Sequence, residues 1–242
     1  MRPELRETLG FLKPHLAGGR LRLLEIGAGE GDLAAALAGL GHRVTALDAD
    51  EESVEAARRR GVDARVARWP DFEGGPYDAV VFSRSLHHMG DLAGTIRRAR
   101  EVLAPGGLLL AEEFDVAAVD EATLLWFTGA VRRCAAAVPI GPDAPALVTA
   151  AIGDGATLAV WADEHGPDLH TAEAMRRAIE RRFALEPVVA AAYLFRYLAW
   201  AMPDTPASRD VVETILEEER LLAGRGDIRL IGRRFAGRAP RG

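Results

Sequence analysis

The sequence predicts an α/β fold with a doubly wound, mostly parallel sheet, and two patterns in its first half support this prediction. Short apolar runs bounded by glycine alternate with segments whose apolar residues recur at helical spacing. The connections between these segments are short. Successive strands are therefore expected to be joined by right-handed crossovers that place helices on both faces of the sheet.

The individual elements follow from these patterns. Apolar runs predict five strands, at residues 21–26, 43–47, 62–67, 77–82 and 108–111. Segments of helical periodicity predict three helices between them, at residues 30–40, 50–60 and 91–103. Gly41 and Gly61 follow the first two helices and are suitable residues for their C-terminal ends.

The second half of the chain is rich in alanine and has a different pattern. It is mostly helical over residues 116–175, with interrupting prolines, and two later runs predict strands at 183–189 and 228–235. No internal repeat or low-complexity linker separates the halves. We therefore expect a single domain over residues 1–242, with a cofactor-binding core at 21–113 and a helical lid plus the final two strands at 114–242.

Charge and composition restrict the partners of the protein. Its 242 residues include 30 basic and 36 acidic side chains, which gives a net charge of −6. Proteins that grip phosphate backbones usually carry a basic face, so nucleic acid is not an expected partner. A single cysteine, Cys134, cannot form an internal disulfide, which fits a reducing compartment. Without a signal-like or membrane-spanning run, we expect a cytoplasmic protein that has no membrane partner.

The strongest local signal is the sequence Glu-Ile-Gly-Ala-Gly-Glu-Gly at residues 25–31, between a predicted strand and a predicted helix. Alternate glycines permit a sharp turn and let a ligand approach the backbone. Asp48 ends the second predicted strand, where its carboxylate can accept both hydroxyl hydrogens of a ribose. The spacing differs from the Gly-x-Gly-x-x-Gly of dinucleotide sites, and Glu25 and Glu30 would repel a pyrophosphate. Both features favour S-adenosylmethionine as the cofactor.

These motifs resemble those of class I S-adenosylmethionine-dependent methyltransferases of the type 11 group. The resemblance covers about residues 21–113 and includes Tyr-Asp-Ala-Val-Val-Phe at 77–82, Ser-Arg-Ser-Leu-His-His at 83–88 and Leu-Ala-Pro-Gly-Gly at 103–107. It implies a Rossmann-like doubly wound sheet of seven mostly parallel strands with an antiparallel last strand and a helical elaboration. It also implies that Gly27 and Gly29 line the methionine portion of the cofactor and that Asp48 holds the ribose.

The full set of predicted cofactor contacts lies on the turn and after the later strands. It comprises Glu25, Gly27, Ala28, Gly29, Gly31, Asp48, Ala49, Arg68, Trp69, Ser83 and Arg84. The product of methyl transfer would be S-adenosylhomocysteine.

One segment departs from the family pattern. Family members commonly carry an Asp after the third strand, which accepts a hydrogen bond from the adenine amino group. Here the segment reads Ala-Arg-Trp-Pro-Asp at residues 67–71 and has no acid in that place. Asp71 or a backbone carbonyl could substitute for it. Trp69 could cover the adenine face, or its indole could serve only in packing.

A catalytic base is sought beyond the fourth strand, beside the methyl group to be transferred. His87 and His88 occupy this region, and histidine titrates near neutral pH. We predict His88 as the preferred base and His87 as the second candidate. The alternative is that neither histidine has a catalytic role, because the pair also occurs in family members in which no such role is clear.

Residues of the second half are candidates to contact the methyl acceptor. We predict His170, Tyr193 and Arg196 as substrate contacts, with Arg196 important if the acceptor bears a carboxylate. The alternatives are that His170 merely flanks a helix beginning near Thr171, and that Tyr193, Arg196 and Tyr197 form a packing face. No histidine spacing suggests a metal site, so no metal is expected.

The leading functional hypothesis is an enzyme that methylates an O, N or C nucleophile of a small molecule by in-line transfer. A second hypothesis is a catalytically silent regulatory or scaffold protein that binds S-adenosylmethionine. A third is a nicotinamide oxidoreductase, which predicts that NADH binds more tightly than S-adenosylhomocysteine. The expected assembly is a monomer or a homodimer.

Overall fold

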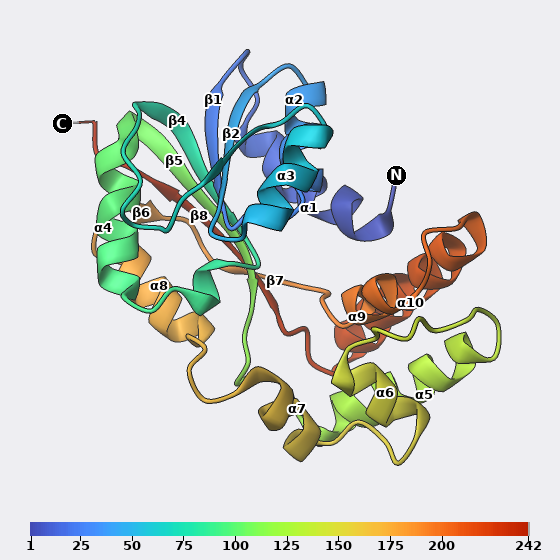
Figure 1. Cartoon of the computed structure of the whole chain (residues 1–242). Coiled ribbons are helices and arrows are strands. Elements are labelled where there is room, and N and C mark those ends of the chain that lie inside the picture. The colour runs from blue at the N-terminus through green and yellow to red at the C-terminus, as the bar shows by residue number, and fades with distance from the viewer. Residues whose placement is uncertain (242) are drawn as a thin grey trace. The chain divides into compact units, whose positions relative to one another are not determined.

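The computed structural model describes residues 1–241 and divides the chain into two compact units (Figure 1). The first, which we call the sheet unit, comprises residues 7–113, 170–189 and 233–241. The second, which we call the helical unit, comprises residues 1–6, 114–169 and 190–232. Each unit is therefore built from segments that are distant in sequence. That the chain folds as a single domain stays a prediction.

The sheet has eight strands in the order β3-β2-β1-β4-β5-β8-β6, with β7 paired to β8 off this path. The pairs β1–β2, β1–β4, β2–β3 and β4–β5 are parallel, and β6–β8 is antiparallel. The strand bounds are β1 Arg22–Ile26, β2 Arg43–Asp48, β3 Asp63–Val66, β4 Tyr77–Ser83, β5 Leu103–Phe114, β6 Ala184–Leu185, β7 Val189–Ala191 and β8 Gly232–Arg238. The predicted fold class, a mostly parallel sheet with an antiparallel strand at one edge, is confirmed.

Two details of the last strands differ from the sequence prediction. The run at 183–189 is not one strand but ends β6 at Leu185 and begins β7 at Val189. Pro187 lies between them and lacks the N–H that a ladder requires, so eight strands form instead of seven. The run predicted at 228–235 is shifted to β8, because its pairing with β6 extends to Arg238 rather than following the apolar residues.

Helices cover both faces of the sheet, as the alternation of elements predicts. Figure 1 shows α4 and α8 on one face and α2 and α3 on the other. The helices that contribute to this unit are α1 Pro3–His15, α2 Asp32–Gly39, α3 Glu51–Arg59, the 3-10 helix η1 Leu86–His88, α4 Leu92–Val102 and α8 Ala172–Glu180. Thr171 is the N-cap of α8 and accepts a hydrogen bond from the Ala174 N–H, which confirms the predicted helix start.

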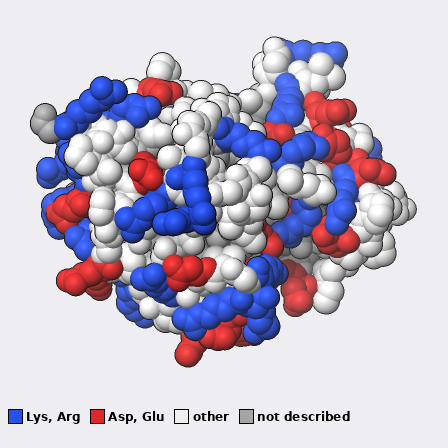
Figure 2. All heavy atoms as spheres, turned by 90° about the horizontal axis from the view of Figure 1, so that it is seen from above, with Lys and Arg blue, Asp and Glu red and all other residues white. Residues whose placement is uncertain are grey.

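The core of the sheet unit consists of the central strands and the helices that cover them. Leu24, Val80, Phe82 and Leu109 are completely buried. Because a parallel sheet is buried on both faces, these strands are nearly continuous apolar runs. Figure 2 views the protein from above Figure 1, toward the end of the sheet where β1 and β2 begin.

The helical unit has a separate core that is rich in aromatic residues. Its helices are α5 Glu121–Ala135, α6 Ala146–Ile152, α7 Leu158–His165, α9 Phe195–Ala201 and α10 Pro206–Arg225. Phe127, Trp161 and Tyr197 pack in this core, and Cys134 is buried among them. Burial raises the pKa of the Cys134 thiol to about 11, consistent with a small packed residue. Among residues 1–241, no helix is long and apolar enough to cross a membrane.

Candidate active site

The glycine-rich turn after β1 is tied to the end of β2. The N–H groups of Gly27 and Ala28 both donate to the Leu47 carbonyl oxygen, at 2.8 and 2.9 Å. Gly27 has φ 69° and Gly29 has φ 52°, in the left-handed region that disfavours other residues. A Cβ at Gly27 would lie 2.5 Å from the Ser85 Cβ, whereas a Cβ at Gly29 would meet nothing within 4 Å. The first glycine therefore permits close packing, and the second borders open space.

Asp48 is fixed at the carboxyl end of β2 by two backbone donors. One carboxylate oxygen accepts from the Gly29 N–H at 2.7 Å, and the other accepts from the Asp50 N–H at 3.0 Å. A carboxylate oxygen has more than one acceptor position, so both oxygens can still accept from a ligand. The turn and Asp48 thus form one preorganised unit, which is the arrangement that the sequence predicts.

A cavity of about 520 Å³ lies at the carboxyl ends of β1 to β4, entirely within the sheet unit. Its volume is in the usual range for a small-molecule site. The residues that line it are Ile26, Gly27, Leu47, Asp48, Ala49, Ala67, Arg68, Trp69, Asp71, Arg84, Ser85, His88, Met89 and Gly90. Six of the predicted cofactor residues and one predicted catalytic histidine are therefore brought together, although they are spread along the chain from Gly27 to His88.

Glu25 is a buried carboxyl at the base of the turn. Its side chain is 2% exposed, and its Oε2 has no hydrogen-bond partner among residues 1–241. Burial raises the pKa of Glu25 to about 8, against the opposing effect of the positively charged Arg84. A buried, unsatisfied acceptor of this kind is costly unless a donor reaches it. Glu25 therefore fits a site for a ligand ammonium group.

Another part of the cavity is lined by the segment after β3. The Trp69 indole N–H donates to the Thr95 carbonyl at 3.3 Å, and its ring meets Phe82 edge-on with centroids 6.4 Å apart. Trp69 is thus held by packing and also lines the cavity, so the two alternatives considered for it are compatible. Asp71 lines the cavity as well, which leaves a carboxylate close to this part of it.

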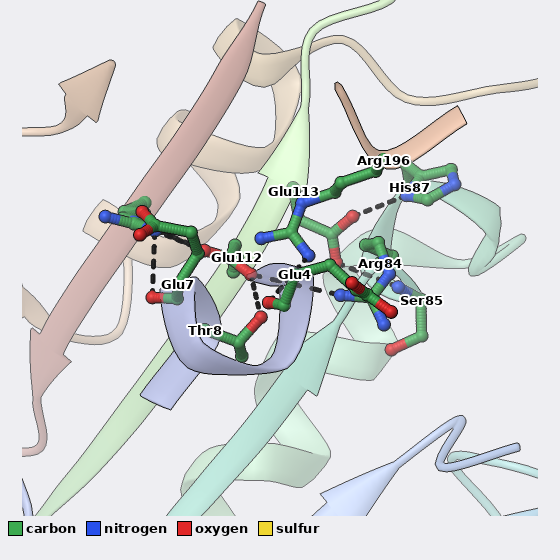
Figure 3. Close-up of polar contacts among 10 residues, drawn as sticks. Glu4, Glu7, Thr8, Arg84, Ser85, His87, Glu112, Glu113 and Arg196 are labelled. Carbon is green, nitrogen blue, oxygen red and sulfur yellow. Dashed lines mark hydrogen bonds and ion pairs between the residues drawn. The ribbon is translucent and has the colours of Figure 1, made fainter. Parts of the chain in front are cut away.

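Glu113 braces the segment between β4 and α4, and the sequence analysis missed it. Its completely buried carboxylate accepts from the N–H groups of Ser85 and Leu86, at 3.0 and 2.8 Å, and pairs with Nδ1 of His87 (Figure 3). Ser85 in turn donates to the Ile26 carbonyl at 2.6 Å. One wall of the cavity is therefore anchored to both β5 and β1. Two consecutive carboxylates in an otherwise apolar strand were the available signal.

Glu112, the other carboxylate, holds a second part of the site. It is 3% exposed and contacts Thr8 and Arg234, and its backbone carbonyl accepts from the Arg84 N–H at 2.8 Å (Figure 3). The Arg84 guanidinium lies 3.9 Å from its carboxylate. Arg84 has φ 58°, the left-handed conformation that is unusual for a residue with a side chain. These contacts fix Arg84 where it lines the cavity.

The two candidate histidines have different environments. His88 is exposed and lines the cavity, whereas His87 is 3% exposed and paired with Glu113. Their rings are 4.1 Å apart. The backbone N–H of His170 donates to the His87 carbonyl, and its Nε2 lies 2.6 Å from the Met89 carbonyl oxygen. His170 thus supports the backbone on either side of His88.

The other two predicted acceptor contacts lie in the helical unit. Arg196 is 1% exposed; it donates to the Glu4 carbonyl at 3.1 Å, and its guanidinium lies over the Phe195 ring. The Tyr193 ring stacks on Phe114 with centroids 4.9 Å apart. Both side chains therefore have packing roles within their unit, and their contact with an acceptor stays a prediction.

Several predicted contacts are not on the lining of the cavity. Glu25, Ala28, Gly29, Gly31 and Ser83 belong to the turn or the strand ends but do not line it. Conversely, sequence reasoning did not select Ser85, Met89 or Gly90, which line it because η1 folds back beside β1. Within residues 1–241, no group of three or more His, Cys, Asp or Glu side chains could hold a metal ion.

Comparison with known families identifies the chain. A sequence family described as a methyltransferase domain matches residues 1–182. The chain belongs to this family of methyltransferases. The predictions of a class I methyltransferase and of S-adenosylmethionine as its methyl donor are thereby confirmed.

Individual relatives match smaller parts of the chain. The ubiquinone biosynthesis O-methyltransferase of Methylocella silvestris is 38% identical over 99 residues, which is 38% of this chain and 39% of the relative. The enzyme of the same name from Xanthomonas oryzae is 39% identical over 110 residues, 42% of this chain and 46% of the relative. The match therefore spans less than half the length of either relative.

Solved structures resemble the fold over almost the whole chain. Phosphoethanolamine N-methyltransferase 2 of Haemonchus contortus, in complex with S-adenosyl-L-methionine, has a TM-score of 0.62 at 16% identity and covers 97% of this chain and 52% of its own. An S-adenosylmethionine-dependent methyltransferase from Mesorhizobium loti has a TM-score of 0.58 at 18% identity, with coverages of 98% and 96%. At these identities the likeness concerns the fold.

Proposed function

We propose that this methyltransferase transfers the methyl group of S-adenosylmethionine to a hydroxyl of a small organic acceptor, and that the cavity of the sheet unit holds the cofactor. The observation that carries the cofactor assignment is the 520 Å³ cavity lined by Gly27 of the glycine turn and by Asp48, and the unsatisfied oxygen of the buried Glu25, two residues before Gly27, supports it. When bound, S-adenosylmethionine supplies an electrophilic methyl group on its sulfonium.

The residues of the cavity and the buried Glu25 beside the turn have complementary roles in this proposal. Asp48 accepts from the ribose hydroxyls while the Gly29 N–H keeps its carboxylate in place. Glu25 accepts from the ammonium group of the methionine portion. Arg84, which lines the cavity, supplies the cation for the carboxylate of that portion. Trp69 covers the adenine, with Asp71 as the nearby acceptor for its amino group.

Two observations support a hydroxyl group as the methyl acceptor. The relatives from Methylocella and Xanthomonas are named O-methyltransferases of ubiquinone biosynthesis, which suggests a hydroxyl of an aromatic ring as the nucleophile. His88 is a titratable side chain on the cavity and can take the proton that such a hydroxyl releases. Tyr193, Arg196 and His170 remain the proposed acceptor contacts. A cytoplasmic location and a monomeric or homodimeric assembly remain predictions.

The proposal is tested with purified protein, S-adenosylmethionine and a panel of catechols, other phenols, quinols, amines and carboxylates. Formation of S-adenosylhomocysteine that depends on a phenolic acceptor is the expected result. Cofactor binding without turnover across the panel would favour the silent regulatory or scaffold protein. Calorimetry in which NADH bound more tightly than S-adenosylhomocysteine would contradict the cofactor assignment.

Replacing Asp48 is expected to weaken cofactor binding. Asp48→Ala removes a charged acceptor from the ribose and leaves the Gly29 and Asp50 N–H groups without their partner. We expect a loss of about 1–3 kcal/mol in the binding free energy of S-adenosylhomocysteine, measured by calorimetry. Asp63→Asn, on β3 and away from the cavity lining, is the control. Unchanged affinity in Asp48→Ala would refute the ribose assignment.

Replacing Glu25 is expected to change the pH dependence of stability. The pKa of Glu25 is raised from 4.5 to about 8 in the folded protein, so between these values the folded state holds a proton that the unfolded state releases. The free energy of unfolding of the cofactor-free protein therefore falls as pH rises from about 4.5 to about 8, and the part of this fall due to Glu25 is absent in Glu25→Gln. Urea unfolding between pH 5.5 and 8.5 gives the free energy of unfolding of the wild type and of Glu25→Gln.

The same substitution is expected to affect cofactor binding in the opposite sense. An ammonium group favours ionised Glu25, so S-adenosylhomocysteine affinity rises with pH in the wild type and is lower and less pH-dependent in Glu25→Gln. Glu30→Gln is the control, because Glu30 is an exposed carboxylate of the same turn that pairs with Arg60. Parallel pH profiles for the wild type and Glu25→Gln would contradict the assignment.

A further inference from the structure

A second cavity lies at the opposite end of the sheet from the cofactor site. It has a volume of about 430 Å³ and is formed before β1 and β2, beside the C-terminal ends of α1 and α2. Its lining consists of Lys13, Leu16, Gly19, Arg20, Leu37, Leu40, Gly41 and His42. It shares no residue with the cofactor cavity, and all of its residues belong to the sheet unit.

The charged groups of this second cavity are all basic. Lys13 and Arg20 are exposed, and neither has an ion pair or side-chain hydrogen bond within residues 1–241. The chain has no Asp or Glu at residues 8–24 or 33–47, although its net charge is −6. Figure 2 looks toward this end of the sheet and shows Lys and Arg side chains interspersed with Asp and Glu on that face of the protein. The cavity is thus a local positive site on an acidic protein.

His42 adds a third donor. Its Nδ1 accepts from the Leu21 N–H at 3.3 Å, so the proton of the neutral ring is on Nε2. Gly19 and Gly41 adjoin the donors, and a Cβ at either glycine would meet nothing within 4 Å. The space between Lys13, Arg20 and His42 is therefore open.

The floor of the cavity is apolar. Leu16 and Leu37 are buried, at 2% and 0% exposure, while Leu40 is 47% exposed at the rim. The cations are not needed to satisfy the end of α2, because the N–H groups of Leu40, Gly41 and His42 already donate to its last carbonyls. A ring of donors over an apolar floor suits a ligand with a charged head and an apolar body.

We propose that this second cavity is a binding site for a small organic anion, a carboxylate or phosphate monoester with an alkyl or aryl body. Lys13, Arg20 and His42 bind the anionic head, and Leu16, Leu37 and Leu40 contact the body. The site is separate from methyl transfer and does not rest on the proposed acceptor or cofactor roles.

The composition of the chain provides a selective experiment. Lys13 is the sole lysine, so an amine-acetylating reagent modifies the Lys13 side chain and the terminal amine of Met1, which serves as an internal reference. The rates at both amines are measured by peptide mass spectrometry with octyl phosphate as the probe. We expect saturable protection of Lys13 by at least about fivefold at several times the dissociation constant, with Met1 unchanged. Octanol tests the body without the charge, and inorganic phosphate tests the charge without the body.

Variants connect the protection to the cavity. In Arg20→Gln/His42→Asn, octyl phosphate is expected to protect Lys13 weakly, whereas Arg59→Gln on the exposed part of α3 keeps full protection. Unchanged S-adenosylhomocysteine binding shows that the double variant is folded. The proposal is wrong if octyl phosphate gives no saturable protection, if octanol protects equally, or if the double variant is protected as well as the wild type. Equal protection by inorganic phosphate would exclude the apolar part of the site.

Discussion

Gly27→Ala is expected to abolish measurable cofactor binding, with a loss of S-adenosylhomocysteine affinity of at least about 100-fold. A Cβ at residue 27 would lie 2.5 Å from the Ser85 Cβ, and φ at this position is 69°, which costs a residue with a side chain about 1–2 kcal/mol by itself. Ser85 cannot retreat easily, because its hydroxyl donates to Ile26 and its N–H to Glu113. The turn must therefore move away from Asp48.

Two further glycine variants show whether a loss of binding in Gly27→Ala comes from the turn itself or from a general loss of stability. Gly39→Ala, at the end of α2, has open space for its Cβ and no positive φ, so binding and stability should be retained or improved. Gly29→Ala also has open space in the protein, but its Cβ would project beside the N–H that holds Asp48. We expect this variant to fold and to bind more weakly. Calorimetry and thermal unfolding measure both properties; wild-type affinity in Gly27→Ala would contradict the turn assignment.

His88→Ala is expected to lower turnover by about 100-fold while leaving S-adenosylhomocysteine affinity nearly unchanged. General-base catalysis typically contributes about 10²–10⁴-fold, and His88 is the histidine that lines the cavity. The rate of the wild type should fall at acidic pH as the imidazole becomes protonated, and this dependence should be absent in the variant. The assay uses the phenolic acceptor that gives the fastest turnover in the panel.

The neighbouring histidine provides the contrast. His87 is buried and paired with Glu113, so His87→Gln should lower stability along with activity by disturbing η1. His15→Ala, on α1 and off the cavity lining, should change neither. If His88→Ala retains full activity and the wild-type pH profile, the base role proposed for His88 is wrong, although the cofactor assignment would stand.

The glycine turn and Asp48 could be predicted because their chemistry is local. A strand followed by alternate glycines and a helix specifies the turn, and a carboxylate ending the next parallel strand must lie at the same edge. In the structure, the turn and Asp48 are joined directly, because the Gly29 N–H donates a hydrogen bond to the Asp48 carboxylate. The parallel strands could also be predicted, because strands that are buried on both faces appear in the sequence as nearly continuous apolar runs.

Long-range contacts decided the remaining features. Glu113 reaches Ser85 and Leu86 from a strand that begins 17 positions after Leu86, and no local pattern specifies that pairing. The second cavity also depends on the meeting of two loops, before β1 and before β2. The sequence by itself thus determined the fold class, the cofactor and the placement of the glycine turn and Asp48 at neighbouring strand ends, since these depend on periodicity and backbone conformation. Only the tertiary structure decided which carboxylates are buried, which histidine lines the cavity and where cations gather without acids, since these depend on packing between distant segments.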